Sequence, residues 1–224
     1  MKILVVEDEP ALARALADAL DDAGFVVEHV SNGEEALHLG GIEPYDAVVL
    51  DLGLPLLDGV TVLQRWRAGG VTVPVLVLTA RGRWPEKLAA FSAGADDYVT
   101  KPFEIQEVIV RLRALLRRAG GTAAAEFACG PVRLDPSRGS VTVNGTPVRL
   151  TERELRILEY LLHRRGHIVS RLDIVDHVYH RDHDRDSNVI DVLIGRIRKK
   201  LGVNVIETVR GLGYRIDEPE EAMS

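Results

Sequence analysis

The sequence lacks any long apolar segment. No run among its 224 residues approaches the roughly 18–20 residues that a membrane-spanning helix needs, which excludes such a segment. The first residues, MKILVVEDE, turn acidic within seven positions and contain no apolar core of a secretion signal, so we expect none.

Cysteine is almost absent as well. Cys129 is the only one, so the chain cannot form an internal disulfide. A single thiol fits a reducing compartment, and we expect a cytoplasmic protein. Because Cys129 lies in an apolar stretch, the sequence favours a packing role over a reactive one.

The charge is distributed unevenly along the chain. The net charge is −6, and residues 1–118 carry 18 acidic and 12 basic residues. Residues 119–216 carry 16 basic and 12 acidic residues, and the last eight residues add four acids and no base. This asymmetry indicates that only the second half meets nucleic acid.

The first half alternates short apolar runs with helical patterns. Such alternation predicts an α/β fold, in which a five-stranded parallel sheet carries helices on both faces and binds ligands beyond the carboxyl ends of its strands. We expect a capping box from Ser31 to Glu34 at the start of the second helix. The expected strands are residues 2–7, 25–30, 46–51, 73–79 and 98–101, and the expected helices include residues 11–23, 59–68, 85–93 and 104–118.

The second half has another order of elements. Residues 119–126 are small and weakly patterned, which indicates a linker between a domain at 1–118 and one at 127–217, with an acidic tail at 218–224. Strands at 131–135 and 140–145 come first, with a turn at Asn144-Gly145. Three helices follow at about 152–164, 171–179 and 188–201, the first capped by a box of Thr151 and Glu154, and a hairpin at 205–216 closes an α+β domain.

Polar residues gather where the parallel sheet places a ligand. Glu7 and Asp8 end the first strand, Asp51 the third, Thr79 the fourth and Lys101 the fifth. Converging carboxylates repel by a few kcal/mol per pair at an effective dielectric of about 20, so the pocket needs a cation, and oxygen ligands suit Mg²⁺. Each residue alone is typical of a solvated strand end; their coincidence at four strands favours a site in which Asp51 forms an aspartyl phosphate.

The motifs in both halves resemble a known family. The segments VVEDE at 5–9, DLGLP at 51–55 with Asp58-Gly59, LTAR at 78–81 and GADDYVTKPF at 94–103 resemble the receiver domain of two-component response regulators. The segments RDSNVIDVLIGRIRKKL at 185–201 and ETVRGLGYRI at 207–216 resemble the winged-helix effector of the OmpR/PhoB family, closest to its PhoP-like branch. The resemblance covers nearly the whole chain and implies a flavodoxin-like receiver followed by a winged-helix domain.

The resemblance assigns roles to the pocket residues. It implies that Asp51 accepts a phosphoryl group from a partner histidine kinase and that Lys101 contacts the phosphate, with a cis peptide bond at Lys101-Pro102. Thr79 and Tyr98 occupy the switch positions. The residues implied to bind Mg²⁺ are Glu7, Asp8, Asp51 and, through its carbonyl, Gly53.

A charged surface of the first half is implied to form a two-fold dimer upon phosphorylation. Its residues are Lys87, Asp96, Asp97, Glu107, Arg111 and Arg118, which by spacing alone are typical of a solvated face. An apolar patch of Ile105, Val108, Leu112 and Leu115 is expected beside them, although some of these side chains must face the sheet.

The helix at 188–201 carries two stripes. Ile190, Leu193, Ile194, Ile197 and Leu201 are expected to face the core. The opposite, basic stripe fits the major groove of double-stranded promoter DNA, and Gly195 lets the helix lie close to a partner. The resemblance makes Arg196 and Val192 base readers, places Asn188, Arg198 and Lys199 near phosphates, and assigns Arg210 to the minor groove and Thr208 and Tyr214 to the DNA backbone.

The loop at 180–188, HRDHDRDSN, is too acidic for phosphate contact. The resemblance implies that it approaches RNA polymerase, and a metal site at His180 and His183 is the weaker alternative.

Together these observations predict a phosphorylation-controlled transcriptional regulator that is not an enzyme beyond phosphotransfer and slow self-dephosphorylation. A phosphatase that uses Asp51 is one alternative, but Gly53 stands where such enzymes usually carry a second acid. An unswitched DNA-binding protein with a degenerate receiver is another, and the complete set of pocket residues speaks against it.

Overall fold

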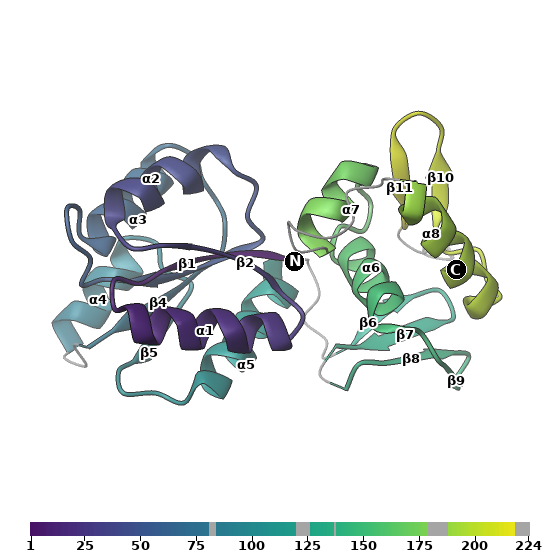
Figure 1. Ribbon diagram of the computed structural model, residues 1–224, viewed down its shortest axis with the longest axis horizontal. Coiled ribbons are helices and arrows are strands. Elements are labelled where there is room, and N and C mark those ends of the chain that lie inside the picture. The colour runs from purple at the N-terminus through teal and green to yellow at the C-terminus, as the bar shows by residue number, and fades with distance from the viewer. Residues whose placement is uncertain (81–83, 120–125, 137, 179–187, 218–224) are drawn as a thin grey trace, which may run out of the picture. The chain divides into compact units, whose positions relative to one another are not determined.

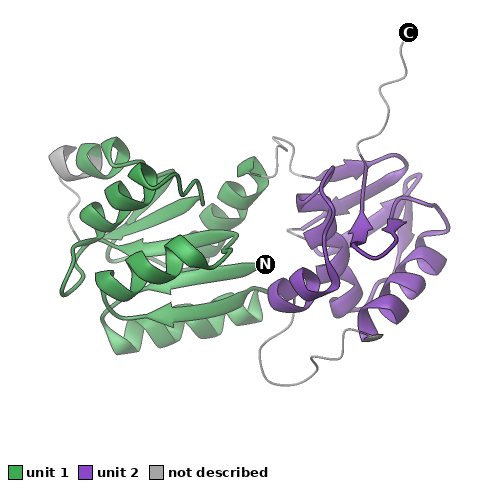
Figure 2. Cartoon of the chain, turned by 90° about the horizontal axis from the view of Figure 1, so that it is seen from above, with its two compact units in different colours: residues 1–119 green, residues 120–224 purple. Residues whose placement is uncertain are grey.

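The computed structural model describes residues 1–80, 84–119, 126–136, 138–178 and 188–217. The chain divides into two compact units, Met1–Ala119 and Gly120–Ser224, which Figure 2 shows in different colours. The predicted linker at 119–126 falls largely on residues outside the described part, and the tail at 218–224 lies wholly outside it. No helix in the described ranges is long and apolar enough to cross a membrane.

The first unit is built on a parallel sheet with the strand order β2-β1-β3-β4-β5, which confirms the predicted α/β class (Figure 1). Its strands are β1 (Lys2–Val6), β2 (Val26–Val30), β3 (Ala47–Asp51), β4 (Val75–Thr79) and β5 (Asp97–Thr100). Its helices are α1 (Pro10–Asp22), α2 (Gly33–Ile42), α3 (Gly59–Ala68), α4 (Trp84–Ser92) and α5 (Ile105–Ala119).

Helices cover both faces of this sheet, so its central strands are buried throughout and apolar except at Lys2, Asp51 and Thr79. All five residues of β1, β3 and β4 are buried, which agrees with their continuous apolar runs. Figure 1 shows α2 and α3 on one face and α1 and α5 on the other. Trp66 of α3 is 1% exposed and belongs to the core of the unit, where its indole donates a hydrogen bond to the Leu37 carbonyl at 3.2 Å.

One predicted cap in this unit is wrong by one residue. The N-cap of α2 is Asn32, not Ser31, because Asn32 has extended backbone angles and its side-chain oxygen accepts from the Glu35 amide at 2.9 Å. The remaining differences lie at element ends: α4 begins at Trp84 and α1 at Pro10. Strands β1 to β4 are one or two residues shorter than predicted, and β5 is shifted by one residue toward the N-terminus.

The second unit combines short antiparallel strands with three helices. One sheet has the order β6-β7-β8-β9, and a hairpin pairs β10 with β11. The strands are β6 (Phe127–Cys129), β7 (Val132–Asp135), β8 (Ser140–Val143), β9 (Thr146–Val148), β10 (Glu207–Val209) and β11 (Gly213–Arg215); the helices are α6 (Glu152–His163), α7 (Arg171–Val178) and α8 (Asn188–Leu201). The sequence pattern missed β6 and β9, which at three residues each are too short to show an alternating period.

Local signals in this unit are confirmed. Asn144 and Gly145 have φ values of 51° and 78°, which are typical of the tight turn that joins β8 and β9. Thr151 and Glu154 form the predicted capping box of α6. The expected core stripe of α8 is buried, with exposures between 0% at Ile197 and 6% at Leu193.

Cys129 packs in this unit as expected. Its side chain is buried, and its thiol donates to the Asp217 carbonyl at 3.5 Å. Burial raises the pKa of the thiol, which lowers the fraction of reactive thiolate.

Candidate functional site

Three carboxylates meet at the carboxyl end of the parallel sheet. Glu7 follows β1, Asp51 ends β3, and these two strands are neighbours with Val6 opposite Leu50. Each of Glu7, Asp8 and Asp51 offers one oxygen, and these oxygens lie within 4.8 Å of one another. Glu7 and Asp51 are buried whereas Asp8 is exposed, so a cation held there would keep an open side toward solvent.

Lys101, after β5, reaches the same cluster. Its ammonium nitrogen lies 2.7 Å from Asp51 Oδ2 and 2.8 Å from Glu7 Oε2. The peptide bond between Lys101 and Pro102 is cis, as predicted. The sheet therefore brings four of the predicted pocket residues together from three strand ends.

The electrostatics of the cluster reflect its burial and crowding. Burial raises the pKa of Glu7 above its ordinary value; the hydrogen bond from Lys101 opposes this rise and the charge of Asp51 adds to it. Burial alone would lower the pKa of Lys101, but its hydrogen bonds to Asp51 and Glu7 outweigh burial and raise it. When the three acids are ionised, one ammonium leaves an excess of negative charge, which a divalent cation can offset.

The other predicted pocket residues lie near these strand ends. Thr79 is buried at the end of β4, whose Leu78 pairs with Asp51 of β3. The Gly53 amide donates to Asp51 Oδ1 at 3.1 Å, which places its backbone beside the cluster. Tyr98 of β5 is partly buried, and its ring meets that of Phe91 edge-on at 5.5 Å.

The charged residues of α5 and β5 form ion pairs within the chain. Arg111 lies 3.1 Å from Asp97 and 2.8 Å from Glu107. Asp96 lies 3.1 Å from Arg67 of α3, a residue that the sequence pattern did not single out. Asp96 also accepts a hydrogen bond from the Val75 amide at 2.8 Å.

Arg118 and Lys87 are the other two basic residues of the predicted charged surface. Arg118 is exposed and donates to the Ala114 carbonyl at 3.3 Å. The side chain of Lys87 lies outside the described part of the structure.

The expected apolar patch on α5 is largely wrong. Val108, Leu112 and Leu115 are at most 3% exposed because they face the core of their own unit. Among the described side chains, the large apolar ones on the surface of this region are instead Leu88 and Phe91 of α4 and Val110 of α5, with exposures of 55%, 45% and 67%. A helical period identifies an apolar stripe, but the stripe that packs inward looks the same in sequence as one that meets a partner.

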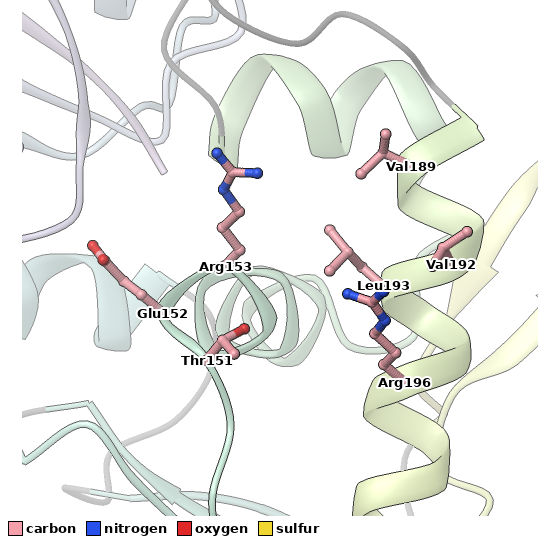
Figure 3. A pocket seen from close by; sticks show the side chains of 7 residues that line it. All are labelled: Thr151, Glu152, Arg153, Val189, Val192, Leu193 and Arg196. Atoms are coloured by element: carbon pink, nitrogen blue, oxygen red, sulfur yellow. The ribbon is translucent and has the colours of Figure 1, made fainter.

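The outer face of α8 is open and borders a groove. Val192 is 54% exposed, and Gly195, Arg196 and Lys199 are exposed too. A groove of about 590 Å³ lies between α8 and the start of α6. Figure 3 shows the side chains that line it. It is lined by Thr151, Glu152, Arg153, Val189, Val192, Leu193 and Arg196.

Three residues predicted to contact the DNA backbone, Arg198, Thr208 and Tyr214, have bonds inside the domain. The Arg198 guanidinium donates to the Ile206 carbonyl at 2.7 Å and to Thr208 Oγ1 at 2.8 Å, which fastens α8 to the start of the hairpin. Tyr214 is 3% exposed and donates its hydroxyl to Asp191 of α8. Burial, with the hydrogen bond to Asp191, raises the pKa of Tyr214 to about 12.

The sequence pattern missed a third anchor of α8. Asp191 accepts two hydrogen bonds from Arg171 of α7, at 2.7 and 3.1 Å. One carboxylate thus joins α7, α8 and the β10–β11 hairpin. The sequence pattern could not predict this link, because its partners lie 20 residues or more apart. The side chain of Asn188 and the loop predicted to approach RNA polymerase, with His180 and His183, lie outside the described residues.

Comparisons with known families agree with the division of the chain into two units. Residues 3–113 match the response regulator receiver domain, and residues 145–216 match the domain described as transcriptional regulatory protein, C terminal.

Relatives match over nearly the full length. The chain is 44% identical over 222 residues to the two-component response regulator PhoP of Pseudomonas aeruginosa, covering 97% of this chain and 99% of that protein. It is 42% identical over 218 residues to the transcriptional regulatory protein PhoP of Escherichia coli K12, covering 96% and 98%. The solved receiver domain of the Francisella response regulator 1452 is 34% identical, with a TM-score of 0.51, and covers 52% of this chain and 97% of its own.

The parallel sheet with its acidic cluster and the helix-and-hairpin unit thus define a response regulator with a DNA-binding effector. The chain belongs to the OmpR/PhoB family, in its PhoP-like branch. It is a phosphorylation-controlled, DNA-binding transcriptional regulator of a two-component system, which works with a kinase.

Proposed function

We propose that Asp51 is the phosphoacceptor and that it takes the phosphoryl group from a histidine kinase. The observation that carries this proposal is the contact of 2.7 Å between Asp51 Oδ2 and the Lys101 ammonium, inside a cluster of three carboxylates. One Asp51 oxygen attacks phosphorus while the bond to the kinase histidine breaks. Lys101 then exchanges its partner from the carboxylate to the phosphoryl oxygens.

The donor set fits Mg²⁺. Carboxylate oxygens from Glu7, Asp8 and Asp51, with the Gly53 carbonyl, match a hard cation that keeps several waters and binds phosphate oxygens. Mg²⁺ would supply neutralisation of the charge that develops on the transferred group. Glu7 and Asp8 would hold the ion, and the exposure of Asp8 leaves room for its waters.

Phosphorylation would reach DNA through the switch residues and the charged surface. Thr79 would turn toward the phosphate and Tyr98 would turn inward, which shifts the population of a two-state element. The face with Asp97, Glu107 and Arg111 would then form a two-fold dimer, and paired half-sites would be bound more tightly. RNA polymerase is the proposed downstream partner, and the cytoplasm the proposed location.

The acceptor is tested with a low-molecular-weight donor. The full chain is incubated with acetyl phosphate and Mg²⁺, and the intact mass is measured over time. We expect one acid-labile phosphoryl group on the wild type and none on Asp51→Asn, because an amide oxygen is a poor nucleophile. Asp58→Asn is the matched control: Asp58 caps α3 in the same loop, and asparagine caps equally well.

The control should be phosphorylated like the wild type. Phosphorylation of Asp51→Asn at the wild-type rate would place the acceptor elsewhere. A wild type that acquires no phosphate would favour a degenerate receiver.

A further inference from the structure

Gly195 lies in the middle of α8, where glycine is unfavourable. Glycine is the poorest helix former after proline, because it gains the most backbone freedom on unfolding. Gly195 is not among the glycines with positive φ, so its backbone conformation is open to any residue. A Cβ atom built at this position meets nothing within 4 Å. The fold of the domain therefore does not require a glycine here.

Gly40 of α2 and Gly59 of α3 have a structural reason to be glycine, whereas Gly41 of α2 is open in the same way as Gly195. A Cβ at Gly40 would lie 2.4 Å from the Trp66 ring, and one at Gly59 would lie 2.3 Å from the Asp51 carbonyl oxygen. These positions are crowded by the protein itself. Gly195 is exposed, and the space beside it is empty within its own unit.

The neighbours of Gly195 point to the occupant of that space. Val192 lies one turn before it, Arg196 follows it directly, and Lys199 lies one turn after it, all on the exposed face. An apolar side chain and two cations on one helix face are complementary to a duplex, which offers thymine methyl groups and phosphates. The hydrogen bonds of Arg198 to Ile206 and of Asp191 to Arg171 hold this helix in place from its sides, so its outer face stays free.

We infer that Gly195 is a specificity-determining position, at which the backbone of α8 approaches the major-groove edge of the DNA within the space that a methyl group would fill. This inference rests on the proposed role of α8 as the recognition helix. A side chain at residue 195 would hold the helix away from the groove and lengthen the contacts of Val192 and Arg196 on either side.

The test uses substitutions whose effects on folding and on binding have opposite signs. Gly195→Ala and Gly195→Met introduce good helix formers of increasing size into open space. Both should raise the thermal-unfolding midpoint of the full chain's second unit by a few degrees. Gly41→Ala is the matched control, because Gly41 also lies in a helix, α2, with nothing within 4 Å of its added Cβ.

The DNA probe is a pool of random-sequence duplexes, long enough for two half-sites about one helical turn apart. The pool is enriched with wild-type protein treated with acetyl phosphate and Mg²⁺, and the enriched duplexes are sequenced. Gly195→Ala should bind these duplexes at least about fivefold more weakly than the wild type, the lower end for one lost base contact. Gly195→Met should lose more, whereas Gly41→Ala should bind like the wild type.

Three results would overturn the inference about Gly195. Wild-type affinity of Gly195→Ala, together with loss of selectivity in Arg196→Ala, would overturn the inference and leave the recognition role of α8 intact. A lowered unfolding midpoint of Gly195→Ala would also overturn it, since the fold would then need the glycine. If the wild type enriches no sequence, the recognition role itself fails and this inference fails with it.

Discussion

Arg111 pairs with Asp97 of its own chain, at 3.1 Å, and holds Glu107 at 2.8 Å with the same guanidinium. Three of the charges proposed to pair across a dimer, Asp97, Glu107 and Arg111, are thus already paired within each subunit. Exposed pairs of this kind contribute only about 0–1 kcal/mol each, so exchanging them for partners in a second subunit has a small cost. The net gain of a dimer then depends on the exposed apolar residues of α4 and α5 and on the symmetric repetition of each contact.

The first prediction concerns this exchange. We expect cross-pairs of Lys87 with Glu107, Asp97 with Arg111 and Asp96 with Arg118. Arg111→Glu should weaken the phosphorylated dimer and operator binding, because it places like charges opposite Asp97 both within and between subunits. Sedimentation of phosphorylated proteins at matched concentration in low salt measures the effect.

The double variant Asp97→Arg/Arg111→Glu is the control for this prediction, since it makes every Asp97–Arg111 pair complementary again. It should restore the dimer. An Arg111→Glu dimer as tight as that of the wild type would show that this face is not the switch interface. The 127–217 fragment should still bind a half-site weakly in either case.

The second prediction separates base reading from phosphate contact on α8. Arg196→Ala should relax base preference at one position of the site, by about 1–3 kcal/mol for a bidentate contact. Lys199→Ala should weaken binding to all sequences and flatten the salt dependence, because it removes a phosphate neighbour. Affinities for a set of single-base operator variants, each at several salt concentrations, distinguish the two. Equal effects of both substitutions on every variant would remove Arg196 from base reading.

The third prediction follows from the bonds of Arg198. Because its guanidinium binds the Ile206 carbonyl and Thr208, Arg198→Ala should lower the unfolding free energy by about 1–3 kcal/mol, the range for lost charge-assisted hydrogen bonds. Lys199→Ala, at the exposed neighbouring position, should change stability little. Urea unfolding measures both. Unchanged stability of Arg198→Ala with a flatter salt dependence of DNA binding would assign it to phosphate contact alone.

The fourth prediction concerns acid stability and Glu154. Burial alone would raise the pKa of this carboxyl, but the bonds from Lys200 at 2.6 Å and from Thr151 prevail and lower it. A lowered folded-state pKa means that the stabilisation is complete above the ordinary value of 4.5 and is lost as pH falls through the folded value. The wild type should therefore lose more stability than Glu154→Gln on acidification.

Calorimetry of the second unit's unfolding, at neutral pH and at about pH 3.5, measures how much stability each protein loses on acidification. Glutamine keeps the cap to Thr151 and loses only the ion pair with Lys200. Glu152→Gln serves as the matched control, because Glu152 is exposed on the same turn and should leave this loss nearly unchanged. If the wild type and Glu154→Gln lost equal stability between these two pH values, this ion pair would add no acid-sensitive stability.

Much of the site was predictable because its information is local. Each pocket residue ends an apolar run, and a parallel sheet necessarily brings the carboxyl ends of neighbouring strands to one edge. Glu7, Asp51 and Lys101 therefore meet as their positions in the sequence predict. The capping box of Thr151 and the buried stripe of α8 follow for the same reason, since each depends on residues within a few helical turns.

Tertiary structure decided which side chains remain available. Val108, Leu112 and Leu115 have the spacing of a surface patch, yet the position of α5 against its sheet buries them. Arg198 of α8 and Tyr214 of β11 were both expected at the DNA backbone, but the packing of the domain brings Arg198 to Ile206 and Tyr214 to Asp191. The sequence by itself determined most of the elements, all but the short strands β6 and β9, and the chemistry at their ends, because short-range periodicity and capping encode both. Only the packed chain determined the partner of each polar group, because such a choice depends on segments that are far apart until folding joins them.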